Sequence, residues 1–103
     1  AILVFLIGGL VSSGCTPEDF SSGVSASEQG DYPRAVEIFT RLAEQGHAGA
    51  QLELGLMYAD GHGLPEDRSQ AVKWYRKSAE QGNVYAQYNL ANAFIIGSGV
   101  PKA

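Results

Sequence analysis

The sequence predicts an all-α fold, an α/α superhelical solenoid in which short helices stack in pairs. The block Ala-Glu-Gln-Gly occurs at 43–46 and again at 79–82, an offset of 36 residues, and a period of about twenty to fifty residues is typical of stacked repeats. Apolar residues within each copy recur at the spacing of an amphipathic helix. The glycine that ends each block, Gly46 or Gly82, suits the left-handed position that closes a helix.

The same offset holds along the rest of the unit. It relates Asp31 to Asp67, Ala35 to Ala71, Phe39 to Tyr75, Ala50 to Ala86, Leu54 to Leu90, Tyr58 to Phe94, Gly61 to Gly97, Gly63 to Gly99 and Pro65 to Pro101. Because the register does not slip, each unit is expected to contain the same pair of helices. Gly55 and its counterpart Ala91 are small enough to let neighbouring helices approach closely.

Five helices are expected, over 18–29, 32–45, 48–60, 67–81 and 84–96. The first is a degenerate helix marked by Phe20 and Val24 at helical spacing, and Gly30-Asp31-Tyr32 begins the second. These two precede a central unit in which the pattern is clearer.

In the central unit, Ala50, Leu54 and Tyr58 share one face of the first helix. A turn containing glycine and proline follows at 60–65. The second helix begins at Asp67, a favourable N-cap. Its inward side chains are expected to be Ala71, Val72, Trp74, Tyr75 and Ala79.

The composition argues against several functions. The chain has 7 Lys and Arg against 11 Asp and Glu, a net charge of −4, so it lacks the basic surface that nucleic acid demands. Its single cysteine, Cys15, excludes an internal disulfide and a thiolate metal cluster. His47 and His62 are expected to be isolated and solvated, so neither is expected to act as a base or ligand. No catalytic residue, metal site or cofactor is predicted, and the protein is not expected to be an enzyme.

An apolar run from Ala1 to Val11 precedes every charged residue. It is shorter than the roughly 20 residues of a membrane-spanning helix and is typical of a secretory signal segment. Ser12-Ser13-Gly14-Cys15 resembles the lipobox of bacterial lipoproteins, although Ser12 stands where that family has Leu. The resemblance implies a signal peptide over 1–15, lipid on Cys15 and a membrane-anchored protein on the periplasmic side of the cell envelope. A plain signal peptide and an uncleaved anchor are the alternatives.

Both helices of the central unit carry a recurring signature. The second has Ala71, Trp74-Tyr75, Lys77, Ala79-Glu80 and Gly82, and the first has Ala50, Leu54-Gly55, Tyr58, Gly61, Gly63 and Leu64. These signatures resemble the Sel1-like repeat, a relative of the tetratricopeptide repeat (TPR), with Ser78 replacing one Ala. The resemblance implies Sel1-like repeats over 31–103, the last one incomplete, preceded by a linker and degenerate helix over 16–30. Either the array is longer or another element covers Phe94, Ile95 and Ile96.

The resemblance also implies a non-enzymatic scaffold that binds another protein or a peptide through the concave side of the stack. At about 100° per residue, Leu52 and Leu56 lie opposite the buried stripe, and Tyr88, Asn89 and Asn92 take matching positions in the next copy. These five residues are the predicted partner groove, although Leu52 and Leu56 could instead pack on the preceding helix pair. The alternative function is a β-lactam- or cell-wall-associated hydrolase of the cysteine-rich Sel1 type, whose paired cysteines this chain lacks.

Overall fold

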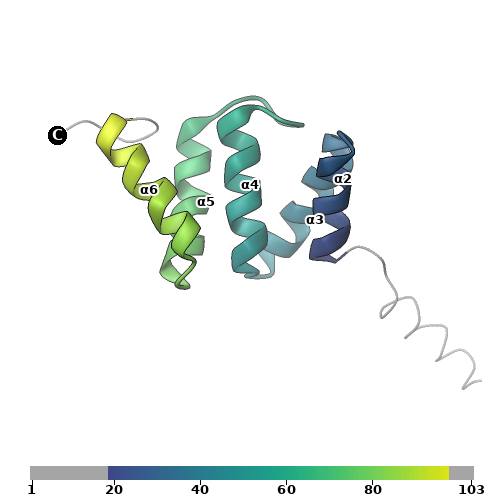
Figure 1. The fold of residues 1–103 in the computed structure, drawn as a ribbon, viewed down its shortest axis with the longest axis horizontal. Helices are drawn as coiled ribbons and strands as arrows, with labels where there is room; N and C mark the ends of the chain where they lie inside the picture. Colours follow the sequence, from purple (N-terminus) through teal and green to yellow (C-terminus); the bar gives the residue numbers. More distant parts are fainter. Residues whose placement is uncertain (1–18, 98–103) are drawn as a thin grey trace, which may run out of the picture.

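The computed structural model describes residues 19–97, which form five α-helices (Figure 1). The helices are α2 (Phe20–Glu28), α3 (Tyr32–Glu44), α4 (Ala48–Asp60), α5 (Arg68–Glu80) and α6 (Val84–Ile96). The all-α fold and the five expected ranges are confirmed, with each end displaced by at most two residues. Residues 1–18 and 98–103 lie outside the described part, and with them the predicted signal segment and Cys15. None of the five helices is both long and apolar enough to cross a membrane.

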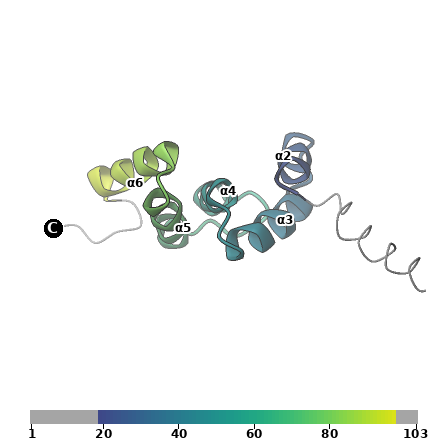
Figure 2. The ribbon, with the colours of Figure 1, turned by 90° about the horizontal axis from the view of Figure 1, so that it is seen from below.

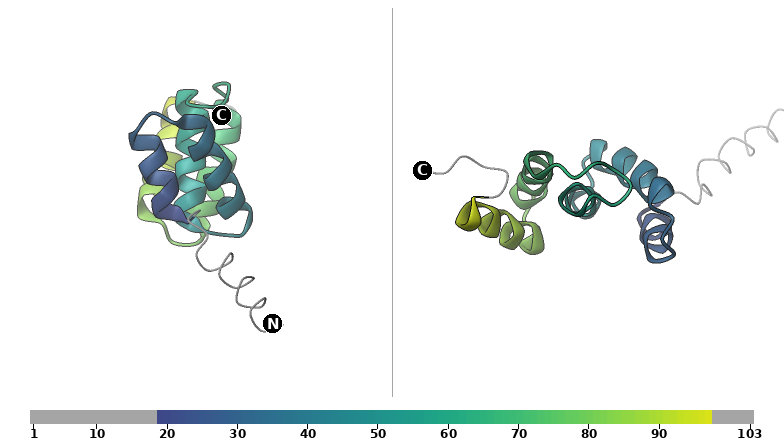
Figure 3. Two further views of the ribbon diagram at one scale, coloured as in Figure 1. Left: turned by 90° about the vertical axis from the view of Figure 1, so that its right-hand side faces the viewer. Right: turned by 90° about the horizontal axis from the view of Figure 1, so that it is seen from above.

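The helices alternate between two rows (Figure 2, Figure 3). We call α2, α4 and α6 the inner row, and α3 and α5 the outer row. Each helix packs mainly on its neighbours along the chain. The inner row is gently concave, because α4 is set back from α2 and α6 in Figure 2. This is the stacking of an α/α solenoid.

Each helix starts at a side chain that accepts a hydrogen bond from its first turn. Asp67, the predicted N-cap of α5, accepts from the backbone N–H of Gln70 at 3.1 Å. The remaining caps are Asp19, Asp31, His47 and Asn83. His47 uses its Nδ1, which accepts from the N–H of Ala50 at 3.0 Å, and its ring stacks on Phe20 with 4.9 Å between centroids. His47 is exposed, as expected, but the expectation that it is isolated is wrong, because the side chain is held by the start of α4 and by Phe20.

Three helices end in the same glycine turn, as the sequence predicts for two of them. At the end of α3, Gly46 takes a φ of +95° and its N–H donates to Ala43 O at 3.0 Å. The next N–H donates to Leu42 O at 3.0 Å, which completes a Schellman turn. The same turn closes α2 at Gly30 and α5 at Gly82. The residue after each glycine is the N-cap of the next helix, so no spacer separates the two.

The hydrophobic core lies between the rows. Its central cluster consists of Ala26, Ala35, Phe39, Ala43, Ala50, Leu54 and Met57. On α5, Ala71, Val72 and Tyr75 are buried as predicted, whereas Trp74 is half-buried against the edge of the cluster. The buried stripes expected from the apolar spacing are thus confirmed on both rows.

A glutamine on each of α4 and α6 bonds back to the helix before it. Gln51 Nε2 donates to Ala43 O at 3.1 Å, and Gln87 Nε2 donates to Ala79 O at 3.2 Å. The two pairs are related by the 36-residue offset. Gln51 is only 5% exposed, and its Oε1 also accepts from Gln81 Nε2 at 2.8 Å. We call these the glutamine bridges; they help to fix the angle at which each inner helix leaves the outer one.

Ser78, which departs from the repeat signature, makes a further bond between α5 and α4. Its hydroxyl is fully buried and donates to Ala48 O at 2.7 Å. Gln81 Nε2 also donates to Gly46 O at 2.9 Å. The start of α4 is therefore tied by hydrogen bonds to both outer helices.

Gly55 is a point of close approach between α4 and α5. A Cβ at this position would lie 2.8 Å from two ring carbons of Tyr75, closer than packed carbons tolerate. The predicted role of Gly55 is confirmed. Its counterpart Ala91 is exposed on α6.

We expect Gly55→Ala to lower the free energy of unfolding by about 1–3 kcal/mol, because α4 must move away from Tyr75. The loss should appear although alanine is the better helix former by about 1 kcal/mol. Urea unfolding of the full chain measures it. The control is Ala91→Gly, which should cost only the helix propensity, and a more stable Gly55→Ala variant would contradict the close-packing argument.

The two glutamine bridges provide a second matched pair of variants. Gln51→Met removes one buried and one part-buried hydrogen bond and should lower the free energy of unfolding by about 1–3 kcal/mol. Gln87→Met removes one exposed bond and should cost less than about 1 kcal/mol. Urea unfolding checks both, and equal losses would show that burial does not strengthen the bridge.

Candidate partner-binding site

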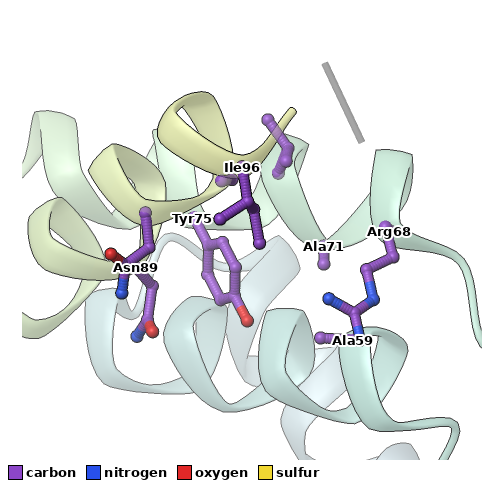
Figure 4. A pocket seen from close by; sticks show the side chains of 9 residues that line it. Ala59, Arg68, Ala71, Tyr75, Asn89 and Ile96 are labelled. Carbon is purple, nitrogen blue, oxygen red and sulfur yellow. The ribbon is translucent and has the colours of Figure 1, made fainter. Parts of the chain in front are cut away.

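A groove lies between α4 and α6, with α5 as its floor (Figure 4). It is lined by Ala59 of α4, by Arg68, Ala71, Val72 and Tyr75 of α5, and by Asn89, Asn92, Ala93 and Ile96 of α6. We call it the α4/α6 groove. Its volume is about 210 Å³, between the roughly 150 Å³ of a cavity that holds benzene and the roughly 300–1,000 Å³ of small-molecule sites. One side chain of a partner fits this space better than a cofactor does.

The groove combines an apolar floor with a polar rim. Ala71 and Val72 are buried beneath it, while Asn89 and Asn92 are half-buried along one wall. Asn89 Nδ2 donates to the backbone carbonyl of Tyr85 at 3.0 Å, which fixes the orientation of that amide. Arg68 closes one end. A peptide entering the groove would therefore meet apolar carbon below and hydrogen-bonding groups at the side.

Charged groups gather near the hydroxyl of Tyr75. Burial raises the pKa of this phenol, the Asp60 carboxylate raises it further, and the Arg68 guanidinium opposes the rise. Arg68 Nε also donates to Glu66 Oε2 at 3.2 Å. Because the pKa of a tyrosine is already near 10, the raised value keeps the hydroxyl protonated at neutral pH. It can therefore donate a hydrogen bond.

In the preceding copy, the matching positions carry larger apolar side chains. The 36-residue offset relates Ala93 to Met57 and Asn92 to Leu56. Met57 is 5% exposed and belongs to the core cluster, and Leu56 is half-buried. The α4/α6 groove is thus open at positions where the preceding copy has bulkier side chains.

The five predicted groove residues are not all in one place. The structure brings Asn89 and Asn92 together in the α4/α6 groove, and Tyr88 lies beside them on α6 with 68% of its surface exposed. Leu52 and Leu56 are half-buried on α4 and do not line the groove. That these residues bind a partner stays a prediction.

Several lining residues were not part of the predicted groove. The sequence pattern assigns Ala71, Val72 and Tyr75 to the core, and it does not mark Ala59, Arg68 or Ile96 as a site residue. The floor of the groove is the edge of the core, so both descriptions apply to the α5 residues. The sequence signal for the groove is Ala93, which stands at the repeat position where the preceding copy has a core methionine.

In the described part of the chain, basic residues are confined to the outer row, which also carries Glu37, Glu44 and Glu80. Within residues 19–97, every Lys and Arg lies on the outer row: Arg34, Arg41, Arg68, Lys73, Arg76 and Lys77. The inner helices carry the acidic residues Glu28, Glu53 and Asp60 and, within their described bounds, no basic residue. The inner row is therefore acidic.

The large apolar side chains that are exposed within residues 19–97 all lie on the C-terminal inner helix, α6. Val84, Tyr85, Tyr88, Phe94, Ile95 and Ile96 of α6 are 50–79% exposed. The Arg76 guanidinium lies 5.6 Å from the Phe94 ring centroid. No other element in residues 19–97 buries this surface.

Metal-ligating side chains do not cluster in the described part of the chain. No set of three or more His, Cys, Asp or Glu within residues 19–97 is placed to hold a metal ion. His62 stacks on Tyr32, with 4.5 Å between centroids, so it is not the isolated side chain that the sequence suggested. Both histidines make packing contacts in the fold.

The alternating rows, the 36-residue offset and the concave inner side define a helical-repeat protein, a class in which stacked helices present an extended binding surface. The family model described as the Sel1 repeat matches residues 20–47, 48–83 and 84–102. The chain belongs to the Sel1 repeat family. The first match takes in α2 as well as α3.

Proteins similar to this chain are considerably longer. A protein named exopolysaccharide production negative regulator, from Rhizobium leguminosarum bv. viciae, is 42% identical over 64 residues, which cover 61% of this chain and 24% of the regulator. The crystal structure of a Sel1 repeat protein from Oxalobacter formigenes matches with a TM-score of 0.73 and 30% identity, covering 80% of this chain and 33% of that one. A protective antigen of uropathogenic Escherichia coli strains, which displays an SLR fold, matches with a TM-score of 0.73 and 32% identity, covering 89% and 21%.

Glu53, the counterpart of Asn89, gives a pH-dependent prediction. Burial on α4 raises the pKa of its carboxyl, so the folded chain holds this proton more tightly than the unfolded chain. Its contribution to stability is greatest below the unfolded-state pKa and is lost as pH rises through the folded-state value. We expect Glu53→Gln to raise the free energy of unfolding at neutral pH by less than about 1 kcal/mol and to flatten the pH dependence.

Urea unfolding of the parent and variant at mildly acidic and neutral pH checks this prediction. The exposed Glu37→Gln of α3 is the control. If the free energy of unfolding of Glu53→Gln depends on pH as that of the parent does, burial of the Glu53 carboxyl is not the cause of that dependence.

Proposed function

We propose that the protein is a non-enzymatic adaptor that binds another protein through its inner row. The observation that carries this proposal is the α4/α6 groove, which opens between two inner helices beside the exposed Tyr88. Sel1 repeats are typical of protein–protein interaction, and stacked helix pairs offer a concave surface suited to it. The size of the groove favours a peptide side chain as its occupant, with no bond made or broken.

We place this adaptor on the periplasmic side of a bacterial cell envelope, held at the membrane by lipid on Cys15. The apolar run before Cys15 and the lipobox-like residues 12–15 support this location. Several acyl chains on Cys15 would give the stable membrane attachment that a single chain cannot provide. The similarity to a protein named as a regulator of exopolysaccharide production supports a regulatory role, in which the adaptor holds a partner instead of transforming a substrate.

A membrane-impermeant cross-linker applied to intact cells, followed by mass spectrometry, tests the binding surface and the location together. We expect the parent chain to capture one specific envelope protein and the Tyr88→Ala, Asn92→Ala double variant to capture it at least about tenfold less. The reason is that the double variant removes an exposed aromatic ring and an amide from the proposed contact surface.

The matched control is Ser69→Ala, Lys73→Ala, which alters two exposed residues of the outer row. This variant should capture the same protein as the parent. Equal capture by all three forms would show that the inner row does not bind the partner. The absence of any cross-link in the parent would argue against both the adaptor role and the envelope location.

A further inference from the structure

The α4/α6 groove differs from the matching position in the preceding copy by the loss of side-chain volume. Ala93 replaces a methionine that is 5% exposed in the core, and Asn92 replaces a leucine. Both replacements are shorter or more polar, while the floor of the groove stays apolar through Ala71 and Val72. The exchange leaves a space of about 210 Å³, which suits an aliphatic side chain supplied from outside.

The polar wall of the groove favours a peptide as the source of that side chain. Each of Asn89 and Asn92 carries a carbonyl oxygen and an NH₂ group, so an amide can pair with a backbone N–H and with a backbone carbonyl. A lipid tail offers neither group. Apolar floor and amide rim together therefore suit an extended or irregular peptide segment with one apolar anchor.

The charge around the groove selects the neighbours of that anchor. Asp60 directly follows the lining residue Ala59 and is close enough to influence the hydroxyl of Tyr75. It stands in the last turn of α4, where the helix dipole disfavours a negative charge, so it does not help the helix. The matching residue on α6 is Ile96. Arg68 also lines the groove, but its Nε donates to Glu66 Oε2 at 3.2 Å, so this cation already faces an anion. The inner helices carry acidic residues and, within their described bounds, no basic one. A basic residue beside the anchor, on the Asp60 side, is therefore complementary to them.

We propose that the α4/α6 groove binds a peptide segment in which one aliphatic side chain sits over Ala71, Val72 and Ala93 and a flanking Lys or Arg faces Asp60. This inference rests on the adaptor function proposed above and adds the chemistry of the partner. The two amides of α6 hold the peptide backbone, and the acidic inner row repels segments whose flanks are acidic.

The test is a heteronuclear NMR titration of the full chain with three synthetic heptapeptides. Nanodiscs of zwitterionic lipid are present throughout to accommodate the apolar N-terminal run. The first peptide is Gly-Ser-Lys-Leu-Lys-Ser-Gly, the second has Ala in place of Leu, and the third has Glu in place of both Lys. We expect the first to shift the resonances of groove residues and to bind at least about tenfold more tightly than each of the others.

Three variants locate the binding. Ala93→Met and Asn92→Leu copy the preceding repeat and should abolish the shifts while the circular dichroism spectrum stays helical; either one that folds is decisive. Asp60→Asn should weaken the basic peptide about tenfold and leave stability equal or higher, since it removes an unfavourable charge from the end of α4. A merely structural role for Asp60 would instead lower stability and leave peptide preference unchanged.

Three results would overturn the inference: equal binding of the Leu and Ala peptides, tighter binding of the acidic peptide, or no shift at the groove with any of them. Each of these leaves the adaptor function intact if the cross-linking experiment still captures a partner through the inner row. Failure of that cross-link in the parent chain would remove the function itself, so the two failures are distinguishable.

Discussion

The hydrogen bonds from a glutamine of α4 and of α6 to the last turn of the preceding outer helix help to set the angle between successive helices, on which the rest of the described structure depends. Gln51 and Gln87 make this bond to equivalent carbonyls, those of Ala43 and Ala79. Each carbonyl oxygen also accepts from the backbone N–H of the glycine that ends its helix, Gly46 or Gly82. The same oxygen atom therefore takes part in the turn that ends the outer helix and in the bridge that orients the next inner helix. Apolar packing then stabilises helices whose mutual angle the bridge helps to define.

The space between neighbouring inner helices is packed in one repeat copy and open in the next. Because successive copies share their helix ends and bridges, a difference in one or two side chains changes the space between inner helices without disturbing the helices themselves. Met57 fills its position as part of the core, whereas the smaller Ala93 leaves the equivalent position in the next copy open, as the α4/α6 groove. A repeat fold can therefore acquire a binding site by losing volume at a position whose backbone is already held in place.

Much of the fold could be predicted from the sequence because its signals are local. Asp67 and Gly82 mark the start and end of α5 by capping alone, and the spacing of Ala50, Leu54 and Tyr58 identifies the side of α4 that faces the core. The candidate site could be predicted less completely from the sequence. The helical spacing places Asn89 and Asn92 on the side of α6 that lines the groove, but the groove also depends on Ala59 and Arg68, which are brought together only by the packing of three helices. Likewise, the roles of His47 and His62 depend on aromatic rings distant in the sequence.

The joining of α3 to α4, and of α5 to α6, without a spacer determines how such a chain can change in length. At residues 45–47, the glycine that closes α3 is followed at once by the side chain that caps α4. One inserted residue would separate these two functions, and a one-residue shift within a helix turns its faces by about 100°, directing buried side chains to solvent. A small insertion at this junction is therefore poorly tolerated, whereas duplication of the whole unit restores every cap, turn and bridge in register. Growth by complete units is the length change that this architecture accommodates most readily.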